Sequence, residues 1–296
     1  GMITPLVSVP QIVLAQNPWA FISRARSGLL DEIKAFIQRR AYRRAYLNAK
    51  HMIYVSSHLH DLYNKYFSAV TEKQSPSVIA YEGLDGSLFD ASDQLVSTER
   101  TPFSVLSVSV YARWKGVETV VAAVGRLRDE GVPAMLSLVG PWADSDYEKS
   151  IREQVRNLGL EASVTFHGKV DVGELHRHYA THQVFCLMSS CESFGIPAAE
   201  AMAFGTPVVS STDCAISEIC AGAGLFGASG DVEWTANALR ELLETPSVWA
   251  ECSEAACKRA ANLSWASVSV SLLKSLGLHH IGSIARNQVA QEGTVE

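Results

Sequence analysis

Apolar runs of strand length alternate with amphipathic helical stretches along almost the whole chain. In the first series the strand-like runs and helices are QIVLAQN (11–17), a helix over about 27–48, HMIYVSS (51–57), a helix over about 58–67, and SVIAYEG (77–83). Strands that alternate with helices indicate parallel sheets with crossover helices. The polar stretch over 85–102 that follows is typical of a connection between two domains.

A second and longer series follows that connection. Its strand-like runs are FSVLSVSV (103–110), AMLSLVG (134–140), SVTFHGKV (163–170), QVFCLMSS (183–190) and PVVSS (207–211). The helices between them are expected at 116–131, 146–159, 171–180 and 197–204, and further helices at 234–244 and 265–276 close the chain. Five parallel strands with crossover helices predict a doubly wound sheet over about 101–265. The predicted fold class is therefore α/β, with domains over 1–95 and 101–265 and a C-terminal helix and tail over 266–296.

Composition favours a reduced, cytoplasmic protein. The chain has 296 residues, 47% of them hydrophobic, which is enough for a sizeable core. No run approaches the roughly 18 apolar residues of a membrane span. The apolar start is interrupted by Pro5 and Pro10 and has no basic residue before Arg24, unlike a signal peptide. The six cysteines form no C-x-x-C pair, so buried free thiols are expected.

Basic residues gather between positions 24 and 50, where eight basic and two acidic residues stand in a chain of net charge −6. Two interpretations stay open. The segment is a solvated helix face whose apolar stripe has core spacing, at Leu29, Ile33, Phe36 and Ile37. Alternatively, it is a docking surface for anionic lipid or another acidic partner. No nucleic-acid partner is expected.

The stretch ESFGIPAAEAMAFGTPVVS (192–210) carries the strongest functional signal. It follows a buried strand, so its turn lies at the carboxyl edge of the sheet, where ligands bind in open α/β folds. Pro197 suits the start of a helix and Gly205 the residue after its end. The helix start leaves free N–H groups that form an anion site, those of Phe194, Gly195 and Ile196.

Two glutamates bracket this anion site. Glu192 lies before the turn, and Glu200 lies about one helical turn inside the helix. Carboxylates accept hydrogen bonds from paired sugar hydroxyls, so one glutamate can hold a ribose and the other a donor sugar, on either side of a phosphate. The alternative is that Glu200 simply favours the first turn of a helix.

The same stretch resembles the C-terminal domain of retaining GT-B glycosyltransferases, glycosyltransferase family 4 (group 1) in particular. The shared signature is Glu, seven residues, Glu, with FG after the first glutamate and EAMA-x-G-x-PVV at the second. Other family marks follow in order, namely KG at 115–116, LSLVG at 136–140, VTFHGKV at 164–170, ELHRHY at 174–179, SE at 217–218 and SW at 264–265. The resemblance covers about 77–275 well and about 11–76 more loosely. It implies a GT-B type fold, with a complete Rossmann-like C-terminal domain and a partial N-terminal α/β domain that lacks about the first hundred residues.

The resemblance also implies residue roles. Glu200 would bind the nucleotide ribose, and Glu192 would bind the donor sugar together with Ser193 and the three amides at 194–196. Lys115 would neutralise the departing diphosphate, and Lys169 and Val170 would border the base. Glu192 and Lys115 are therefore the expected catalytic residues. The expected donor is a UDP-sugar or a GDP-sugar, and neither a metal nor a cofactor is expected.

This sequence departs from the family pattern at two places. Relatives usually have an arginine five or six residues before the KG lysine, where this chain has Val110 and Ser109. Arg113 is the candidate substitute, its alternative being an exposed loop arginine. The turn after the first strand often carries a histidine near the reacting centre, and Gln16 and Asn17 stand there instead. These two residues are the candidates on the acceptor side.

Other chemistry is less well supported. Asp144-Ser145-Asp146 resembles the D-x-D metal motif, but it precedes a predicted helix, where an aspartate acts as a cap. His176, His178 and His182 have no cysteine or carboxylate partner at metal spacing, and 178 and 182 are expected on one helical face. They are expected to be surface histidines. The chain contains no Walker-type cradle, and no G-x-G-x-x-G follows a strand, which argues against an ATPase or a dehydrogenase.

Two classes of function remain. The first is a transferase that moves a hexose, with retention, from a nucleoside diphosphate to a glycan or lipid-linked acceptor. The alternative is a non-catalytic or partner-dependent nucleotide-sugar-binding subunit, and a sugar-nucleotide 2-epimerase fits less well. Three front strands leave an unpaired edge, so self-association or a partner chain is expected through residues 1–75. The helix over 24–50 would then join that interface or contact the inner face of the membrane.

Overall fold

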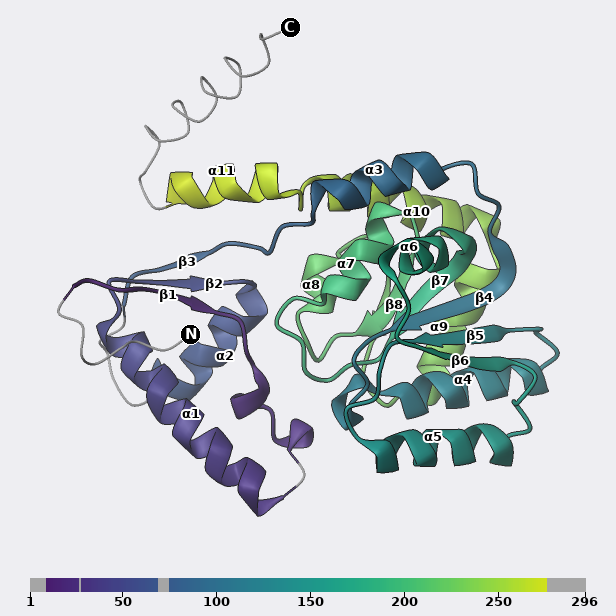
Figure 1. The fold of residues 1–296 in the computed structure, drawn as a ribbon, viewed down its shortest axis with the longest axis horizontal. Helices are drawn as coiled ribbons and strands as arrows, with labels where there is room; N and C mark the ends of the chain where they lie inside the picture. The colour runs from purple at the N-terminus through teal and green to yellow at the C-terminus, as the bar shows by residue number, and fades with distance from the viewer. Residues whose placement is uncertain (1–8, 27, 69–74, 276–296) are drawn as a thin grey trace, which may run out of the picture.

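The computed structural model describes residues 9–26, 28–68 and 75–275, and it forms two α/β domains joined near the top of Figure 1. The front domain holds a three-stranded parallel sheet in the order β1-β2-β3. Its elements are β1 (Ile12–Ala15), η1 (Trp19–Phe21), η2 (Ser23–Ala25), α1 (Leu29–Asn48), β2 (His51–Tyr54), α2 (Ser57–Phe67) and β3 (Ser77–Ile79). The predicted strands and helices of this part are confirmed.

Aromatic side chains make the core of the front domain. Phe21 lies 4.8 Å from the ring of Tyr63 and 5.8 Å from that of Tyr42, measured between ring centroids. The buried face of α1 consists of Ala35, Tyr42, Ala45 and Tyr46. These alanines and tyrosines form the side of α1 that packs into the core. The other apolar stripe of the helix, noted in its sequence, therefore lies on the exposed side. The expectation that this stripe packs into the core is therefore wrong, since Leu29, Ile33, Phe36 and Ile37 are 77%, 49%, 53% and 61% exposed.

The rear domain holds a six-stranded parallel sheet in the order β6-β5-β4-β7-β8-β9. Its strands are β4 (Thr101–Val108), β5 (Met135–Val139), β6 (Val164–Gly168), β7 (His182–Leu187), β8 (Val208–Ser211) and β9 (Gly224–Gly227). The five predicted strands are confirmed. The prediction missed β9, because a four-residue run with glycine at both ends has little strand signal.

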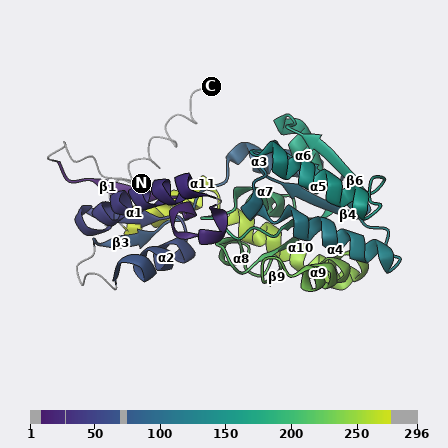
Figure 2. The ribbon, with the colours of Figure 1, turned by 90° about the horizontal axis from the view of Figure 1, so that it is seen from below.

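Helices cover both faces of the rear sheet, as Figures 1 and 2 show. They are η4 (Arg113–Lys115), α4 (Val117–Asp129), α5 (Ser145–Asn157), α6 (Val172–Thr181), α7 (Ile196–Ala203), α8 (Ile216–Ile219), α9 (Val232–Glu244) and α10 (Pro246–Ala261). Helices α4, α5 and α9 belong to the core on one face. The core on the other face, beneath α6 and α7, is continuous with the core of the front domain. The two domains therefore share one buried apolar cluster.

Residues 85–102 differ from the expected plain connection, because they contain the helix α3 (Gly86–Leu95). Asp85 caps this helix, and Leu88 is buried. The helix contacts α6 and α7, and the Ser92 hydroxyl donates a hydrogen bond to the carbonyl of Ala203 at 2.7 Å. A few apolar positions in a polar segment are enough to dock a short helix on a neighbouring apolar face.

Within the described residues the chain crosses between the domains twice, and the two crossings lie side by side. Leu84 forms a parallel bridge with Ser264, and its N–H donates to the carbonyl of Leu263 at 2.7 Å. After the second crossing, α11 (Trp265–Ser275) contacts β3 of the front domain. None of the helices in residues 9–26, 28–68 and 75–275 has an apolar stretch long enough to span a bilayer.

Candidate active site

A crevice of about 460 Å³ lies between the domains and is lined from both sides. Gln16 and Asn17 follow β1 on the front side, while Lys115, Glu192 and Ser193 line the rear side. The structure thus brings the predicted acceptor-side residues into one crevice with both predicted catalytic residues. This arrangement follows from the fold, because β4 and β7 are neighbours and the loops after them meet at the carboxyl edge of the sheet.

Lys115 and Glu192 form an ion pair at the floor of this crevice. The Lys115 Nζ lies 2.5 Å from Glu192 Oε1, and each side chain is 15% exposed. Because both charges are largely shielded from water, their interaction is stronger than that of a surface pair. The pair places a cation and a carboxylate next to the start of α7.

Backbone packing explains why a glycine follows Lys115. Gly116 has φ of +66°, and a Cβ there would lie 2.3 Å from the carbonyl oxygen of Met188. The Trp114 carbonyl accepts hydrogen bonds from the Ser190 N–H at 2.8 Å and the Ser189 hydroxyl at 3.1 Å. The KG turn is therefore fastened directly to the loop that carries Glu192.

The loop after β7 enters α7 through a second strained glycine. Gly195 has φ of +94°, and a Cβ there would lie 2.4 Å from Cγ1 of Ile216. The helix starts at Ile196, one residue earlier than expected, and Pro197 lies in its first turn. Among the described residues, no acceptor pairs with the N–H groups of Phe194, Gly195 and Ile196. These groups and the helix dipole make the start of α7 a site of positive potential.

Glu200 occupies a different environment from Glu192. Its Oε2 accepts a hydrogen bond from the Tyr179 hydroxyl at 2.7 Å. Burial raises the pKa of Glu200, and the Tyr179 hydrogen bond partly opposes that shift. Glu192 lines the 460 Å³ crevice, and Glu200 is not among its lining residues.

The other predicted donor residues are not among those that line this crevice. Lys169 is exposed at the end of β6, and Val170 is half-buried against the shared core. Arg113 pairs with Asp144 at 3.2 Å, with its guanidinium 5.3 Å from the centre of the Tyr147 ring. Asp144 also accepts from the N–H groups that open α5, which confirms the predicted cap.

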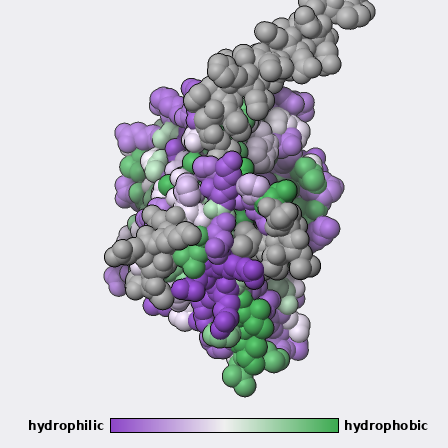
Figure 3. All heavy atoms as spheres, turned by 90° about the vertical axis from the view of Figure 1, so that its left-hand side faces the viewer, coloured by the Kyte–Doolittle hydropathy of each residue, from purple (hydrophilic) through white to green (hydrophobic). Residues whose placement is uncertain are grey.

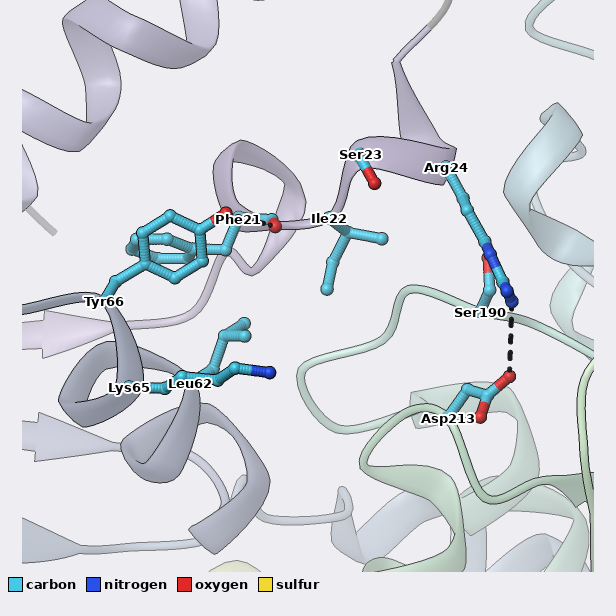
Figure 4. Close-up of a pocket in the computed structure, with 9 residues that line it drawn as sticks. All are labelled: Phe21, Ile22, Ser23, Arg24, Leu62, Lys65, Tyr66, Ser190 and Asp213. Carbon is cyan, nitrogen blue, oxygen red and sulfur yellow. Dashed lines mark hydrogen bonds and ion pairs between the residues drawn. The ribbon is translucent and has the colours of Figure 1, made fainter.

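A second interdomain crevice, of about 490 Å³, lies beyond the η1–η2 segment (Figure 4). Arg24 reaches across it to Asp213, with 3.8 Å between Nη1 and Oδ2. Lys65 and Tyr66 of α2 line the front side, and Ser190 lines the rear side. This crevice could not be predicted from sequence, because its residues come from four separate segments.

Glu218 links the two domains, a role that the sequence did not reveal. Its carboxylate accepts from the N–H groups of Ser57 and His58 at the start of α2, both at 2.8 Å, and from the Tyr81 hydroxyl at 3.0 Å. The Ser56 hydroxyl also donates to the carbonyl of Ser193 at 2.7 Å. Burial lowers the pKa of His58, against the opposing charges of Glu218, Asp61 and Asp213. Glu218 thus helps to hold the front domain on the rear one.

The histidines depart from expectation in two ways. Helix α6 ends at Thr181, so His182 begins β7 and does not share a helical face with His178. A carboxylate partner is also present, because Glu174, His178 and His167 bring ligand-type atoms within 4.8 Å of one another. Glu174 and His178 are four residues apart on a helix, and that spacing is the signal the sequence contained.

Fold and site together define a two-domain α/β protein with parallel sheets and a charged crevice between its domains. The model of the family described as glycosyl transferases group 1 matches residues 91–259, and the chain belongs to this family.

Curated relatives match part of the chain at moderate identity. D-inositol 3-phosphate glycosyltransferase of Mycobacteroides abscessus is 30% identical over 215 residues, which are 67% of this chain and 46% of that protein. Mannosylfructose-phosphate synthase of Agrobacterium fabrum is 32% identical over 135 residues, which are 42% of this chain and 30% of that protein. The chain spans less than half the length of these relatives.

Solved structures share the fold over most of the chain. Sucrose-phosphate synthase of Thermosynechococcus elongatus superposes with a TM-score of 0.71 at 24% identity, covering 95% of this chain and 68% of that one. HepE of Anabaena in complex with UDP and glucose gives a TM-score of 0.72 at 20% identity, covering 90% and 71%. The predicted GT-B type α/β fold is thereby confirmed.

Proposed function

We propose that this protein transfers a hexose from a nucleoside diphosphate sugar to a glycan or lipid-linked acceptor, with retention of anomeric configuration. The observation that carries the proposal is the shielded Lys115–Glu192 pair beside the amides of 194–196, facing Gln16 and Asn17 across one crevice. Family membership supports transferase chemistry. A UDP-sugar is the preferred donor, because a neighbour of the same fold holds UDP and glucose.

The crevice supplies what breaking the donor bond requires. The bond between the sugar C1 and the diphosphate oxygen breaks, and the diphosphate leaves with the electron pair. Lys115 and the amides of 194–196 offer positive potential where that charge grows. The acceptor hydroxyl forms the new bond to C1 on the same face, and its proton passes to the departing diphosphate oxygen. In this proposal Glu192 orients the donor sugar and Glu200 holds the ribose.

A binding screen tests the donor. UDP, GDP and ADP, and their glucose or mannose conjugates, are compared by thermal shift and calorimetry. A ligand present at a hundred times its Kd adds about 2.7 kcal/mol to stability. We expect UDP to give the largest effect, and no shift with any nucleotide at millimolar concentration would overturn the proposal.

Transfer itself needs its own measurement. With the preferred donor and a set of glycan and lipid acceptors, product is followed by chromatography, and its anomeric configuration by NMR. Activity is expected to persist in EDTA, because Lys115 and the backbone amides supply the positive potential that a metal supplies elsewhere. An inverted product would contradict retention, and complete loss in EDTA that magnesium restores and zinc does not would contradict the role given to Lys115.

An exposed apolar surface on the front domain supports the alternative of a partner-dependent subunit. On β1, Ile12 is 53% exposed and Leu14 is 43% exposed, on the sheet face opposite Val13. We propose self-association or a partner chain through residues 1–75, with β1 in the contact. Light scattering on the wild type and on Ile12→Ser/Leu14→Ser tests it. A monodisperse monomer that transfers sugar efficiently would contradict this arrangement.

Helix α1 supports contact with a membrane. Its exposed stripe of Leu29, Leu30, Ile33, Phe36 and Ile37 runs beside exposed basic residues, Lys34, Arg40, Arg43 and Arg44. Figure 3 shows a hydrophobic cluster next to a strongly hydrophilic one at the lower end of this face. Apolar side chains next to cations suit a surface of anionic lipid. Sedimentation with phosphatidylglycerol vesicles is expected to carry the protein down, and Phe36→Ser/Ile37→Ser should abolish this, while neutral vesicles give the background.

A further inference from the structure

Two histidines and a glutamate meet at the end of β6, away from the proposed transfer chemistry. His167 lies in β6, and Glu174 and His178 lie one turn apart in α6. One ligand-type atom from each residue falls within 4.8 Å of the other two. The carboxylate Oε1 of Glu174 stands 3.9 Å from Nε2 of His178, and their side chains are 44% and 12% exposed.

The Nε2 atom of His178 is buried and has no hydrogen-bond partner in the described part of the chain. A buried ring nitrogen without a partner costs free energy, so its position calls for a ligand. The Arg177 side chain beside it is exposed to solvent, which screens its charge.

A chain of hydrogen bonds orients the histidine of β6. His182 Nδ1 lies 2.8 Å from the carbonyl of His178, to which it donates, so its Nε2 accepts from the Ser137 hydroxyl at 2.9 Å. The Ser137 oxygen is then free to accept from His167 Nε2 at 3.4 Å. His167 is then protonated on Nε2 and keeps a lone pair on Nδ1, which is free to bind a metal ion.

We propose that His167, Glu174 and His178 bind one divalent cation of the zinc type, which fastens α6 to the end of β6. Two imidazoles and a carboxylate suit zinc rather than magnesium or calcium, which prefer oxygen ligands. Tetrahedral zinc holds its ligand atoms about 3.4 Å apart. The half-exposed Glu174 side chain can close that gap, and the fourth position is left for water. The ion would stiffen the loop of Lys169 and Val170 that follows β6.

The test uses the full chain without a purification tag and after treatment with EDTA. Zinc is titrated by calorimetry, and cobalt binding is followed by its visible absorption spectrum. We expect one ion per chain, a thermal midpoint that rises with zinc concentration, and a cobalt spectrum without thiolate charge transfer. His167→Ala and His178→Ala should each weaken binding by more than about tenfold, since loss of even an outer partner costs 10- to 100-fold.

His176→Ala is the matched control, because His176 lies in the same helix but packs against Phe204 and stands outside the cluster. It should bind zinc as the wild type does, and circular dichroism checks that each variant is folded. Equal zinc affinity in the wild type and in His167→Ala/His178→Ala would overturn the proposal. A thiolate band in the cobalt spectrum would also overturn it, because it would assign the ion to cysteine. Zinc binding does not depend on transfer activity, so this outcome is separate from that of the proposed function.

Discussion

Replacing Lys115 should weaken UDP binding, whereas replacing Glu192 by glutamine should not. In the protein without nucleotide, Lys115 Nζ lies 2.5 Å from Glu192 Oε1 with both side chains 15% exposed. A diphosphate at the start of α7 must therefore compete with Glu192 for the ammonium. Lys115→Met removes the cation and keeps the length of the side chain, whereas Glu192→Gln removes the competing charge.

A charged hydrogen bond contributes about 1.5–3 kcal/mol, so Lys115→Met should weaken UDP binding by about 10- to 150-fold. Glu192→Gln should leave bare UDP binding unchanged or strengthen it by up to about tenfold, because the ammonium no longer has a charged neighbour. The same variant should still turn over more slowly, since Glu192 is proposed to orient the donor sugar.

Calorimetry with UDP measures the affinities, and initial rates with the UDP-sugar measure turnover. Lys149→Met is the matched control, because Lys149 is 73% exposed in α5 and its loss removes the same charge elsewhere. If Lys115→Met binds UDP as tightly as the control, or if Glu192→Gln weakens UDP as much as Lys115→Met does, the pair is a structural ion pair that does not face the diphosphate.

Three further predictions follow from other contacts. Glu200→Ala should weaken bare UDP by about 10- to 150-fold in calorimetry, more than Glu192→Ala does, and equal effects would contradict the separate roles of the two glutamates. Burial lowers the pKa of His182 from 6.5 to about 4, beside His178, His167 and Arg100, so the unfolded chain takes up the proton first. In EDTA, urea unfolding should then show a loss of up to about 3 kcal/mol as the pH falls from 6.5 to 4, which His182→Gln should flatten. Glu218→Ala should lower the free energy of unfolding by about 2 kcal/mol, because the cap of α2 is lost, and Glu218→Gln should lower it less. If both variants are as stable as the wild type, Glu218 does not link the domains.

Much of the rear domain could be predicted from sequence, because its strands are apolar runs bounded by turn residues. The contact between Lys115 and Glu192 could also be predicted from sequence. Each follows a parallel strand, and parallel strands present their carboxyl ends at one edge. The glycines after Lys115 and before Ile196 stand where a side chain would strike the neighbouring backbone or Ile216. At these positions the glycine that the local turn requires is also the residue that the packing of the domain requires.

Other features lay beyond sequence reasoning for physical reasons. Both apolar stripes of α1 have helical spacing, and only the packing of Tyr42 and Tyr46 decides which one is buried. Glu218 meets partners about 160 positions earlier in the chain, and nothing local marks that contact. His167 joins Glu174 and His178 because β6 and α6 are adjacent in space, although the four-residue spacing within α6 was visible.

The double crossing at Leu84 and Ser264 determines how the two domains can move. Two neighbouring backbone segments joined by one parallel bridge connect the domains here, so they are the natural place for a hinge. Figure 1 shows the two crossings near the top of the view, beside α3 and α11, and a swing about them would separate Ser56 from Ser193 and Arg24 from Asp213. A ligand held by the rear domain alone would leave that swing free. A molecule that also touches Gln16 and Asn17 would hold the two domains closed, so closure would require a ligand that spans the crevice.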